Sequence, residues 1–523
     1  MQFNKVSEAP TNPNQPSPRK KFDVADLFSG ELDAPATAST ASGLDEKARQ
    51  AYFWIVNYAI ISPFYDLEYQ DQPPQVYAFG DQQHPFVLPT GQSYASFVLI
   101  PLLTLLTRRR CLFVGGPGRG KTASSILMAV LAGYSLQEIR RGIQHGQPEM
   151  TVTDLLGNPL PKDLVQADQM DDIRIAWRKW LSMRVKIIDE YNRIPTRTQS
   201  ALLTLMGDNY AEVLDQIYEC PEAAWYLTAN DDAGGGTYQV IEALRDRIDV
   251  VVKALHFPSR FFGDLLHRME AGIKPENVVP PEIIFSPEEL DRAYASIMEV
   301  PIPQDLRRRI EFFASHFEFL DTAAQQFEYK TKDTAKLSGL DFQQIVQADT
   351  GRDKAKDVGT TTRNGLSVRA IMTILTYVKA MAWFRGNAEV MLEDVRQMLP
   401  FVLHDKLVPN LDAPFFDQAG HGVYRVDRIG WIRKLFDLTC VEFDRLDLEH
   451  DDPVGELKTR FEAGLEGLSA QDVTQRLVEI EALLKSWTTS RKLYGHLHDD
   501  LLTLKYLHQR YMNYLRWLNW QKN

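Results

Sequence analysis

The sequence predicts an α/β fold, a parallel sheet flanked by helices, followed by a mostly helical second half. Two observations carry this prediction. Between residues 52 and 252, short β-branched runs alternate with longer runs of helical spacing, a rhythm typical of a parallel sheet whose strands are joined by helices. After residue 286, the apolar residues recur at helical spacing.

The α/β region is predicted at residues 46–255. Its strand-like runs are CLFVGG, VKIIDE, AAWYLTAN and IDVVVK, and its helical runs are TASSILMAVLAGY and TQSALLTLMGDNY. Residues 1–45 are rich in Pro, Asn, Ser, Thr and Ala. Such a segment buries too little surface to offset the entropy of ordering, so we expect it to be flexible.

A helical region is predicted at residues 256–415. Ser286, followed by Pro287, is a suitable N-cap for one helix, and Gly386 is a suitable C-cap for another. Between these helices, residues 329–364 are polar and without periodicity, which predicts a long loop or insert.

Residues 416–523 are predicted to form a C-terminal helical extension. A capping box at Ser469 and Asp472 precedes apolar residues spaced by threes and fours, and a second such series follows Gly495. Two helices, arranged as a hairpin, are expected. The aromatic residues of the last helix either close this bundle or dock a partner: Tyr506, Tyr511, Tyr514, Trp517 and Trp520.

Composition narrows the functional classes. The net charge of −12 argues against a broad basic face for nucleic acid. The three cysteines are far apart and fit neither a disulfide framework nor a CxxC metal site, which favours a cytoplasmic location. The most apolar stretches fall short of the roughly 20 residues that a membrane helix requires.

A phosphate-binding loop follows the first predicted strand. CLFVGGPGRGKTASS matches the pattern GxxxxGK[ST] and opens a helix. Backbone N–H groups in such a loop surround phosphates, and the helix N-terminus adds its positive dipole end. The predicted nucleotide contacts are Gly115, Gly116, Pro117, Gly118, Arg119, Gly120, Lys121, Thr122 and Ala123.

Two adjacent carboxylates end a second predicted strand, in KIIDE. Thr122 and Asp189 are expected to bind Mg²⁺, and Lys121 the β- and γ-phosphates of ATP. Glu190 is then free to polarise the attacking water, which a magnesium-bound carboxylate does poorly. The alternative is that the two acids only cap a strand in solvent, which the loop upstream makes the weaker interpretation.

Further motifs resemble those of the MoxR family of AAA+ ATPases. The stretch YLTANDDAGGGTYQVIEALRDRIDVVV contains Asn230, then Gly236-Thr237-Tyr238, then Asp246-Arg247, in the family's order. DEYNRIPTRTQSALLTLM, GLSVRA and, more weakly, TVTDLLG are also similar to family motifs. The resemblance covers approximately residues 85–407.

The resemblance implies roles that spacing alone does not give. Asn230 would orient the hydrolytic water, Arg369 would contact the γ-phosphate from a helical lid, and Arg247 would reach a neighbouring subunit's nucleotide as an arginine finger. Arg245 is a competing finger. The alternative for Arg247 is a surface ion pair with Asp246 or Glu242. Ile248 stands where the family more often has Phe.

The expected function is therefore that of an ATP-hydrolysing ring, of six subunits as is usual in the family, that remodels, matures or activates a partner protein. The resemblance implies a separate partner with a von Willebrand factor A domain. Three alternatives remain open: a nucleic-acid-directed NTPase, a motor subunit like that of a magnesium chelatase, and a nucleotide-gated scaffold.

Two weaker patterns have ordinary explanations. In residues 173–184, Trp177 and Trp180 are spaced for one helical face, so packing against the core is preferred to base stacking. In HLHDD, residues 496–500, the two histidines of a helix point to different faces, which argues against a metal site.

Overall fold

A computed structural model describes residues 43–522, apart from residues 61–63, 70–72, 74, 79, 81–84, 89–90, 168, 170–171, 231–239, 258, 273, 322, 340–357, 492 and 494. Helix α1 (Leu44–Trp54) begins inside the segment predicted to be flexible, and the rest of that segment lies outside the described residues. No helix in the described part of the chain is both long and apolar enough to cross a membrane.

The centre of the molecule is a parallel five-stranded sheet with the order β13-β5-β12-β9-β6. The four predicted strands are present, and β6 is an additional strand too short to give a pattern. The bounds are β5 (Arg110–Val114), β6 (Gln144–His145), β9 (Val185–Asp189), β12 (Ala224–Ala229) and β13 (Val250–Lys253). Val114 pairs with both Ala229 and Lys253, so the carboxyl ends of three strands meet at one edge.

Alternate strand residues enter different cores, as the pleat of a sheet requires. Cys111 and Phe113 of β5 belong to one core, with helices on that face of the sheet: α1, α2 (Ser96–Thr107), α3 (Lys121–Leu131), α10 (Pro287–Glu299) and α14 (Val368–Arg385). Leu112 belongs to the other core, which includes α5 (Val152–Leu156), α7 (Thr196–Asp208) and α8 (Glu242–Arg247). The sheet is therefore covered on both faces, and the predicted fold class is confirmed.

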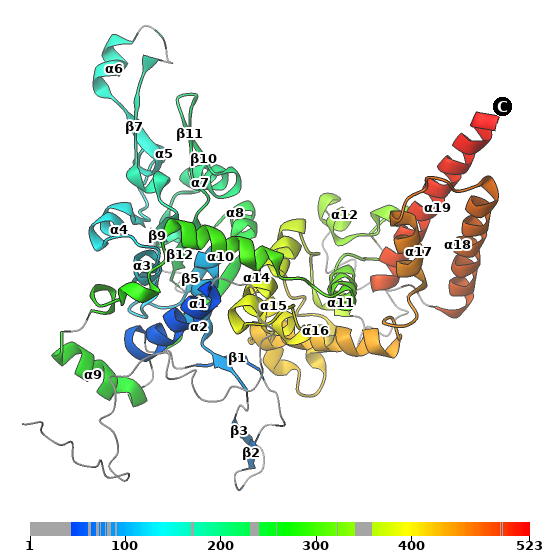
Figure 1. Cartoon of the computed structure of the whole chain (residues 1–523), viewed down its shortest axis with the longest axis horizontal. Helices are drawn as coiled ribbons and strands as arrows, with labels where there is room; N and C mark the ends of the chain where they lie inside the picture. Colours follow the sequence, from blue (N-terminus) through cyan, green and yellow to red (C-terminus); the bar gives the residue numbers. More distant parts are fainter. Residues whose placement is uncertain are drawn as a thin grey trace, which may run out of the picture.

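Two protrusions extend from the second face and lie at the top of Figure 1. One contains α5, β7 (Gly157–Pro159), α6 (Pro161–Gln166) and β8 (Ile175–Trp177), and the other is the hairpin of β10 (Tyr210–Val213) and β11 (Gln216–Glu219). The helix expected over residues 173–184 was wrong, because this stretch forms β8 and a 3₁₀ turn, Lys179–Ser182. Trp180 is nevertheless buried, and Trp177 packs against Tyr218.

Helices follow the sheet in sequence, with the expected caps. Ser286 caps α10 in a capping box, and Gly386 ends α14 with a left-handed backbone. The other helices after the sheet are α9 (Phe262–Glu270), α11 (Gln304–Ser315), α12 (Lys332–Leu337), α15 (Leu392–Leu403) and α16 (Arg428–Arg445), while α4 (Leu136–Gly142) lies between α3 and β6. Helix α12 lies within residues 329–364, whose middle part is outside the described residues, so the described part of that segment is not all loop.

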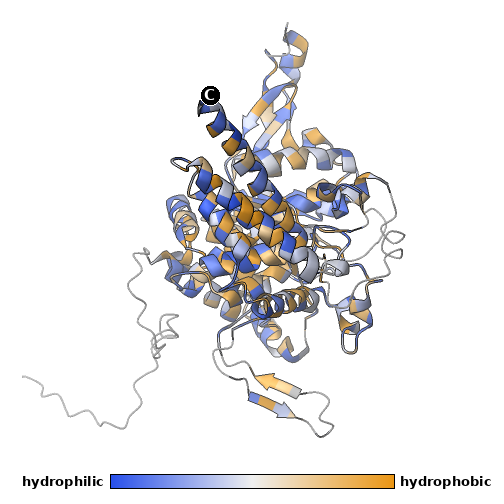
Figure 2. Cartoon of the chain, turned by 90° about the vertical axis from the view of Figure 1, so that its right-hand side faces the viewer, coloured by the Kyte–Doolittle hydropathy of each residue, from blue (hydrophilic) through white to orange (hydrophobic). Residues whose placement is uncertain are grey.

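The last three helices form a separate core, at the right of Figure 1: α17 (Pro453–Glu462), α18 (Ala470–Ser490) and α19 (Gly495–Lys522). Helices α18 and α19 pack against each other as the expected hairpin. Helix α16, by contrast, packs on α15 and α11. The hairpin of β2 (Gln75–Ala78) and β3 (Pro85–Leu88) projects from the body at the bottom of Figure 2.

Candidate functional site

The phosphate-binding loop connects β5 to α3 at the carboxyl edge of the sheet. Gly118 and Gly120 have φ angles of 72° and 77°, which glycine adopts without strain. Gly115 has no room for a side chain, because a Cβ there would lie 2.5 Å from the carbonyl oxygen of Ala254. The loop ends where α3 begins at Lys121, so free N–H groups of a helix N-terminus face the loop.

Lys121 is buried in this loop, with only 7% of its surface exposed. Its Nζ donates to the carbonyl oxygens of Gly115 and Gly116, the latter at 2.8 Å, and to Oδ1 of Asn230 at 2.9 Å. Asn230 directly follows β12. The ammonium group is therefore held between the loop and the neighbouring strand, where it can meet a phosphate.

Asp189, the last residue of β9, lies across from the loop. Its Oδ1 accepts hydrogen bonds from Thr122 Oγ1 at 2.8 Å and Thr228 Oγ1 at 2.6 Å. His145 Nδ1 lies 3.5 Å from Oδ2. A threonine hydroxyl and a carboxylate oxygen this close fit two positions of a Mg²⁺ coordination shell, whose remaining ligands are ordinarily phosphate oxygens and water.

Glu190 has a left-handed backbone, with φ 55°, which turns the chain sharply after β9. Its Oε1 accepts from Asn230 Nδ2 at 2.9 Å, and its Oε2 lies 3.1 Å from Nε of Arg193. The turn passes so close to Gly146 that a Cβ on this glycine would lie 2.2 Å from the Glu190 carbonyl oxygen. The absence of a side chain at Gly146 therefore leaves room for the turn at Glu190, which directs its side chain away from that of Asp189.

Arg247 and Arg369 lie at the opposite edge of the sheet. Arg247 ends α8 just before β13, and Asp249 N bonds to the carbonyl oxygen of Arg110 at the start of β5. Arg369, in the first turn of α14, pairs with Asp246. A five-residue strand such as β5 separates the two edges by about 13 Å. Neither arginine therefore lies beside the Lys121 of its own chain.

The alternative partners proposed for Arg247 have other contacts. Its Nη1 donates to the carbonyl oxygen of Ala243 at 3.2 Å, whereas Asp246 pairs with Arg369 and Glu242 with Lys336. Arg245 is exposed. Both arginines remain candidates for the finger, and Gly236, Thr237 and Tyr238 lie outside the described residues.

A buried glutamine hydrogen-bonds to two segments, one at each edge of the sheet. Gln199 of α7 is fully buried, its Nε2 donates to the carbonyl oxygen of Ile194 at 3.0 Å, and its Oε1 accepts from Ile241 N at 3.2 Å. Ile194 follows the Glu190 turn, and Ile241 precedes α8. Sequence reasoning missed Gln199 and Arg193; a polar residue on the apolar stripe of α7 was the available signal for the former.

A hollow of about 100 Å³ adjoins the loop on the β13 side. Phe97, Leu255 and Phe401 line it, with the side chains of Arg119 and Asp66. Arg119 Nη1 donates to the carbonyl oxygen of Ala254 at 2.9 Å. Burial raises the pKa of the Asp66 carboxyl, although Ser96 N and Oγ donate to it.

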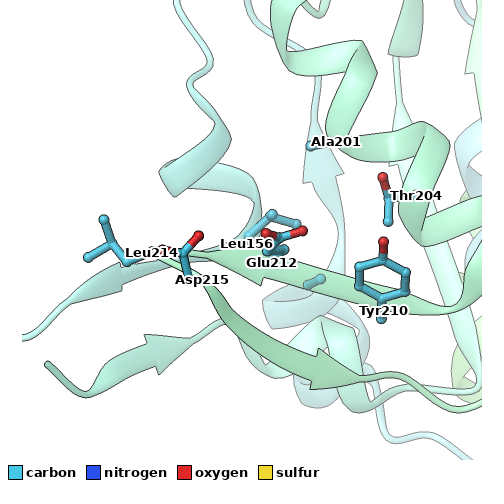
Figure 3. A pocket seen from close by; sticks show the side chains of 8 residues that line it. Leu156, Ala201, Thr204, Tyr210, Glu212, Leu214 and Asp215 are labelled. Carbon is cyan, nitrogen blue, oxygen red and sulfur yellow. The ribbon is translucent and has the colours of Figure 1, made fainter. Parts of the chain in front are cut away.

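A second hollow, of about 370 Å³, lies between α7 and the β10–β11 hairpin. Figure 3 shows the hydroxyl of Tyr210 pointing toward Thr204, with Glu212 and Leu156 beside them. The nearby tips carry exposed apolar side chains: Leu164 (54% exposed) and Val165 (86%) in α6, and Ile217 (63%) in β11.

Comparisons with known proteins give this geometry a family context. The family described as "ATPase family associated with various cellular activities (AAA)" matches residues 110–250, and an AAA lid domain matches residues 354–423. The chaperone MoxR1 of Mycobacterium tuberculosis (strain ATCC 25618 / H37Rv) is 23% identical over 315 residues, which cover 60% of this chain and 71% of that protein. Over these regions the chain is similar to the MoxR-like AAA+ ATPases.

A solved structure of a "putative ATPase" from Cytophaga hutchinsonii ATCC 33406 is also similar, with a TM-score of 0.44 and 19% identity over 65% of this chain and 89% of the other. The family matches confirm the predicted AAA+ core with its lid and the predicted ATPase activity. Nucleotide binding is implied by the family, and the residues around Lys121, Thr122 and Asp189 fit MgATP.

Proposed function

We propose that this MoxR-like ATPase forms a homo-oligomeric ring, of six copies as the resemblance implies, and uses ATP hydrolysis to remodel, mature or activate a partner protein. One observation carries the proposal. Lys121 and Glu190 lie at the carboxyl edge of the sheet, whereas Arg247 and Arg369 lie at the amino edge. Each chain then offers half of a site on one side and the other half on the opposite side, as a head-to-tail ring requires.

The residues at the carboxyl edge would hold and hydrolyse the nucleotide. Lys121 and the loop from Gly115 to Ala123 would hold the phosphates, and Thr122 and Asp189 would hold Mg²⁺, which neutralises developing phosphate charge when bound. Glu190 would accept a proton from the attacking water.

Three further residues would complete the catalytic arrangement. Asn230 donates to Glu190 at 2.9 Å and accepts from Lys121 at 2.9 Å, which supports a role in which it would orient the attacking water. Arg247 and Arg369 would approach the γ-phosphate of the adjacent copy, where a finger in trans contributes ~10³ to 10⁵ in rate.

The hollow beside Arg119 would receive the base of the nucleotide. It adjoins the loop and is lined by Phe97, Leu255 and Phe401, and apolar walls with a few polar groups are usual for such ligands. Asp66 and Ser96 supply the polar groups. Because Phe401 belongs to α15, closing the hollow around a base would couple nucleotide binding to the lid.

The protein partner would meet the two protrusions. Exposed apolar residues at Leu164, Val165 and Ile217 are suited to an unfolded or loosely folded segment. The hollow between α7 and the hairpin would take one of its side chains. A separate chain with a von Willebrand factor A domain is the partner that the resemblance implies, nucleic acid is not expected, and the cytoplasm remains the predicted location.

Affinity capture from the source cell tests this proposal. Glu190→Gln should bind ATP, hydrolyse it slowly and so retain clients, while Lys121→Ala, unable to hold nucleotide, serves as the control. Enrichment of a protein with a von Willebrand factor A domain and its associates by Glu190→Gln alone would support the proposal. Enrichment of DNA or a nuclease would instead support the nucleic-acid alternative and refute remodelling of proteins.

A further inference from the structure

Helix α19 has two different faces. Leu504, Leu507 and Tyr511 are buried against α17 and α18 in the C-terminal core. On another side, Tyr506, Trp517 and Trp520 are 50%, 46% and 75% exposed. The C-terminal aromatics therefore divide between closing the bundle and facing solvent.

We call the exposed side the outer face of α19, and define it by Lys505, Tyr506, Arg510, Arg516, Trp517 and Trp520. All six are exposed. Positions 506, 510, 513, 517 and 520 follow one another at intervals of four and three, so they share one stripe of the helix. Lys505 and Arg516 each precede a stripe residue and lie along one side of the stripe, and Lys505 also pairs with Glu328. In Figure 2, which faces this unit, the free end of α19 carries hydrophobic and hydrophilic residues together and projects beyond its neighbours.

This outer face is basic in an acidic protein. Residues 501–522 contain Lys505, Arg510, Arg516 and Lys522 but no Asp or Glu, although the chain has a net charge of −12. The guanidinium of Arg510 lies 5.8 Å from the ring of Tyr506 and 5.7 Å from that of Phe461 in α17. Aromatic residues and arginine are enriched at interfaces, so the face fits an acidic segment with apolar side chains.

One segment of this chain has that chemistry. Residues 22–33, FDVADLFSGELD, contain four acidic residues, no basic residue, and most of the large apolar residues of positions 1–42. We propose that this segment binds the outer face of α19. Its carboxylates would pair with Arg510 and Arg516, and its apolar side chains would cover Trp517 and Trp520.

The segment is joined to α1, which packs in the core on the sheet, whereas α19 belongs to the separate C-terminal core. Ten residues, 34–43, join it to α1 and span at most about 35 Å when extended. Figure 1 places α1 near the sheet and the free end of α19 in the separate C-terminal unit. The outer face could be covered by residues 22–33 of its own chain or by residues 22–33 of an adjacent copy. The two segments are chemically identical, so the experiment must distinguish them.

Photocrosslinking in the full-length chain tests the proposal. Phe28 is replaced by p-benzoylphenylalanine, and the crosslinked peptides are identified by mass spectrometry. We expect crosslinks to residues 501–522, reduced at least about tenfold in Arg510→Glu/Arg516→Glu, because like charges then face each other. Lys485→Glu, which reverses an exposed charge on α18, is the matched control and should leave the yield unchanged.

A charge exchange guards against a variant that fails for another reason. Adding Asp23→Lys/Asp26→Lys to Arg510→Glu/Arg516→Glu should restore the crosslink, with circular dichroism confirming that the total helix content is unchanged. An isotopically heavy copy mixed with a light one tells whether the segment belongs to the same chain or an adjacent one. Crosslinks elsewhere, or a yield indifferent to the Arg510 and Arg516 charges, would overturn the proposal.

Other occupants are separate outcomes of the same variants. If wild-type protein sediments with phosphatidylglycerol vesicles through Arg510 and Arg516 while Phe28 does not crosslink to α19, a lipid surface and not the segment covers the face. An acidic oligonucleotide bound in the same way would likewise refute the proposal. Failure of each of these ligands to compete with the crosslink would support it.

Discussion

Two variants that are inactive alone should form an active ring when mixed. Lys121→Ala removes the buried ammonium group from the carboxyl edge but leaves Arg247 and Arg369 at the amino edge intact. Arg369→Ala retains the nucleotide half-site and lacks one arginine. Since the edges are about 13 Å apart along β5, far beyond hydrogen-bond distance, each variant should supply what its neighbour lacks.

The expected recovery follows from ring geometry. An interface works only when an Arg369→Ala copy holds the nucleotide and a Lys121→Ala copy supplies the arginines. In a ring assembled at random from equal amounts, about a quarter of the head-to-tail interfaces meet this condition. A homogeneous Arg369→Ala ring should lose most of its hydrolysis, as loss of a finger in trans costs ~10³ or more, and a homogeneous Lys121→Ala ring should lose it because no copy holds nucleotide.

The assay is steady-state phosphate release from rings co-expressed with two tags and purified through both. Lys121→Ala mixed with Glu190→Gln is the matched control, because both lesions lie at the same edge and no interface is repaired. Recovery near a quarter of wild type with Arg369→Ala, and none in the control, is the predicted result. No recovery with Arg369→Ala, where Arg247→Ala recovers, would refute a role for Arg369 in trans.

Three other perturbations should have measurable effects. Arg193→Ala frees one carboxylate oxygen of Glu190 from its ion pair. Because an exposed ion pair is worth at most about 1 kcal/mol, we expect kcat for ATP hydrolysis to rise up to about fivefold at constant KM. A fall in kcat would instead mean that Arg193 orients the Glu190 base. Gly146→Ala should lower kcat about a hundredfold while ATP still binds, because the added Cβ would lie 2.2 Å from the Glu190 carbonyl oxygen. Gly263→Ala is the control and should leave kcat unchanged, because a Cβ there has nothing within 4 Å. Burial lowers the pKa of His496 to about 2, so unfolding takes up a proton and stability is lost as pH falls below ~6.5. In His496→Phe, the free energy of unfolding measured with urea should therefore depend less on pH between pH 5 and 7. An unchanged dependence on pH would contradict this.

The features that the sequence predicted are those specified by neighbouring residues. The loop at Lys121 and the caps at Ser286, Ser469 and Gly386 depend on short spacings, and the structure has each helix end where the cap predicted it. The four longer strands of the sheet were equally evident, because buried parallel strands are continuous apolar runs. The catalytic roles assigned to Glu190 and the other site residues remain predictions.

What the sequence did not predict involves distant partners or very short elements. Arg369 pairs with Asp246, 123 positions away, and no local pattern indicates that pairing. The strand β6 has two residues, too few for a period. In residues 173–184, Trp177 and Trp180 fitted helical spacing, but a strand and a 3₁₀ turn can place two tryptophans at the same interval, and tertiary packing decided between them.

In the proposed ring, the fully buried amide of Gln199 would couple the two nucleotide sites to which one subunit contributes. A shift of the turn after Glu190, at one interface of the subunit, would displace Ile194. Through the Gln199 amide it would also displace Ile241, and with it the arginines that face the opposite interface. Hydrolysis would then proceed as a wave from subunit to subunit. In Gln199→Leu, the sites would hydrolyse ATP independently, and the dependence of the hydrolysis rate on ATP concentration would have a Hill coefficient near one.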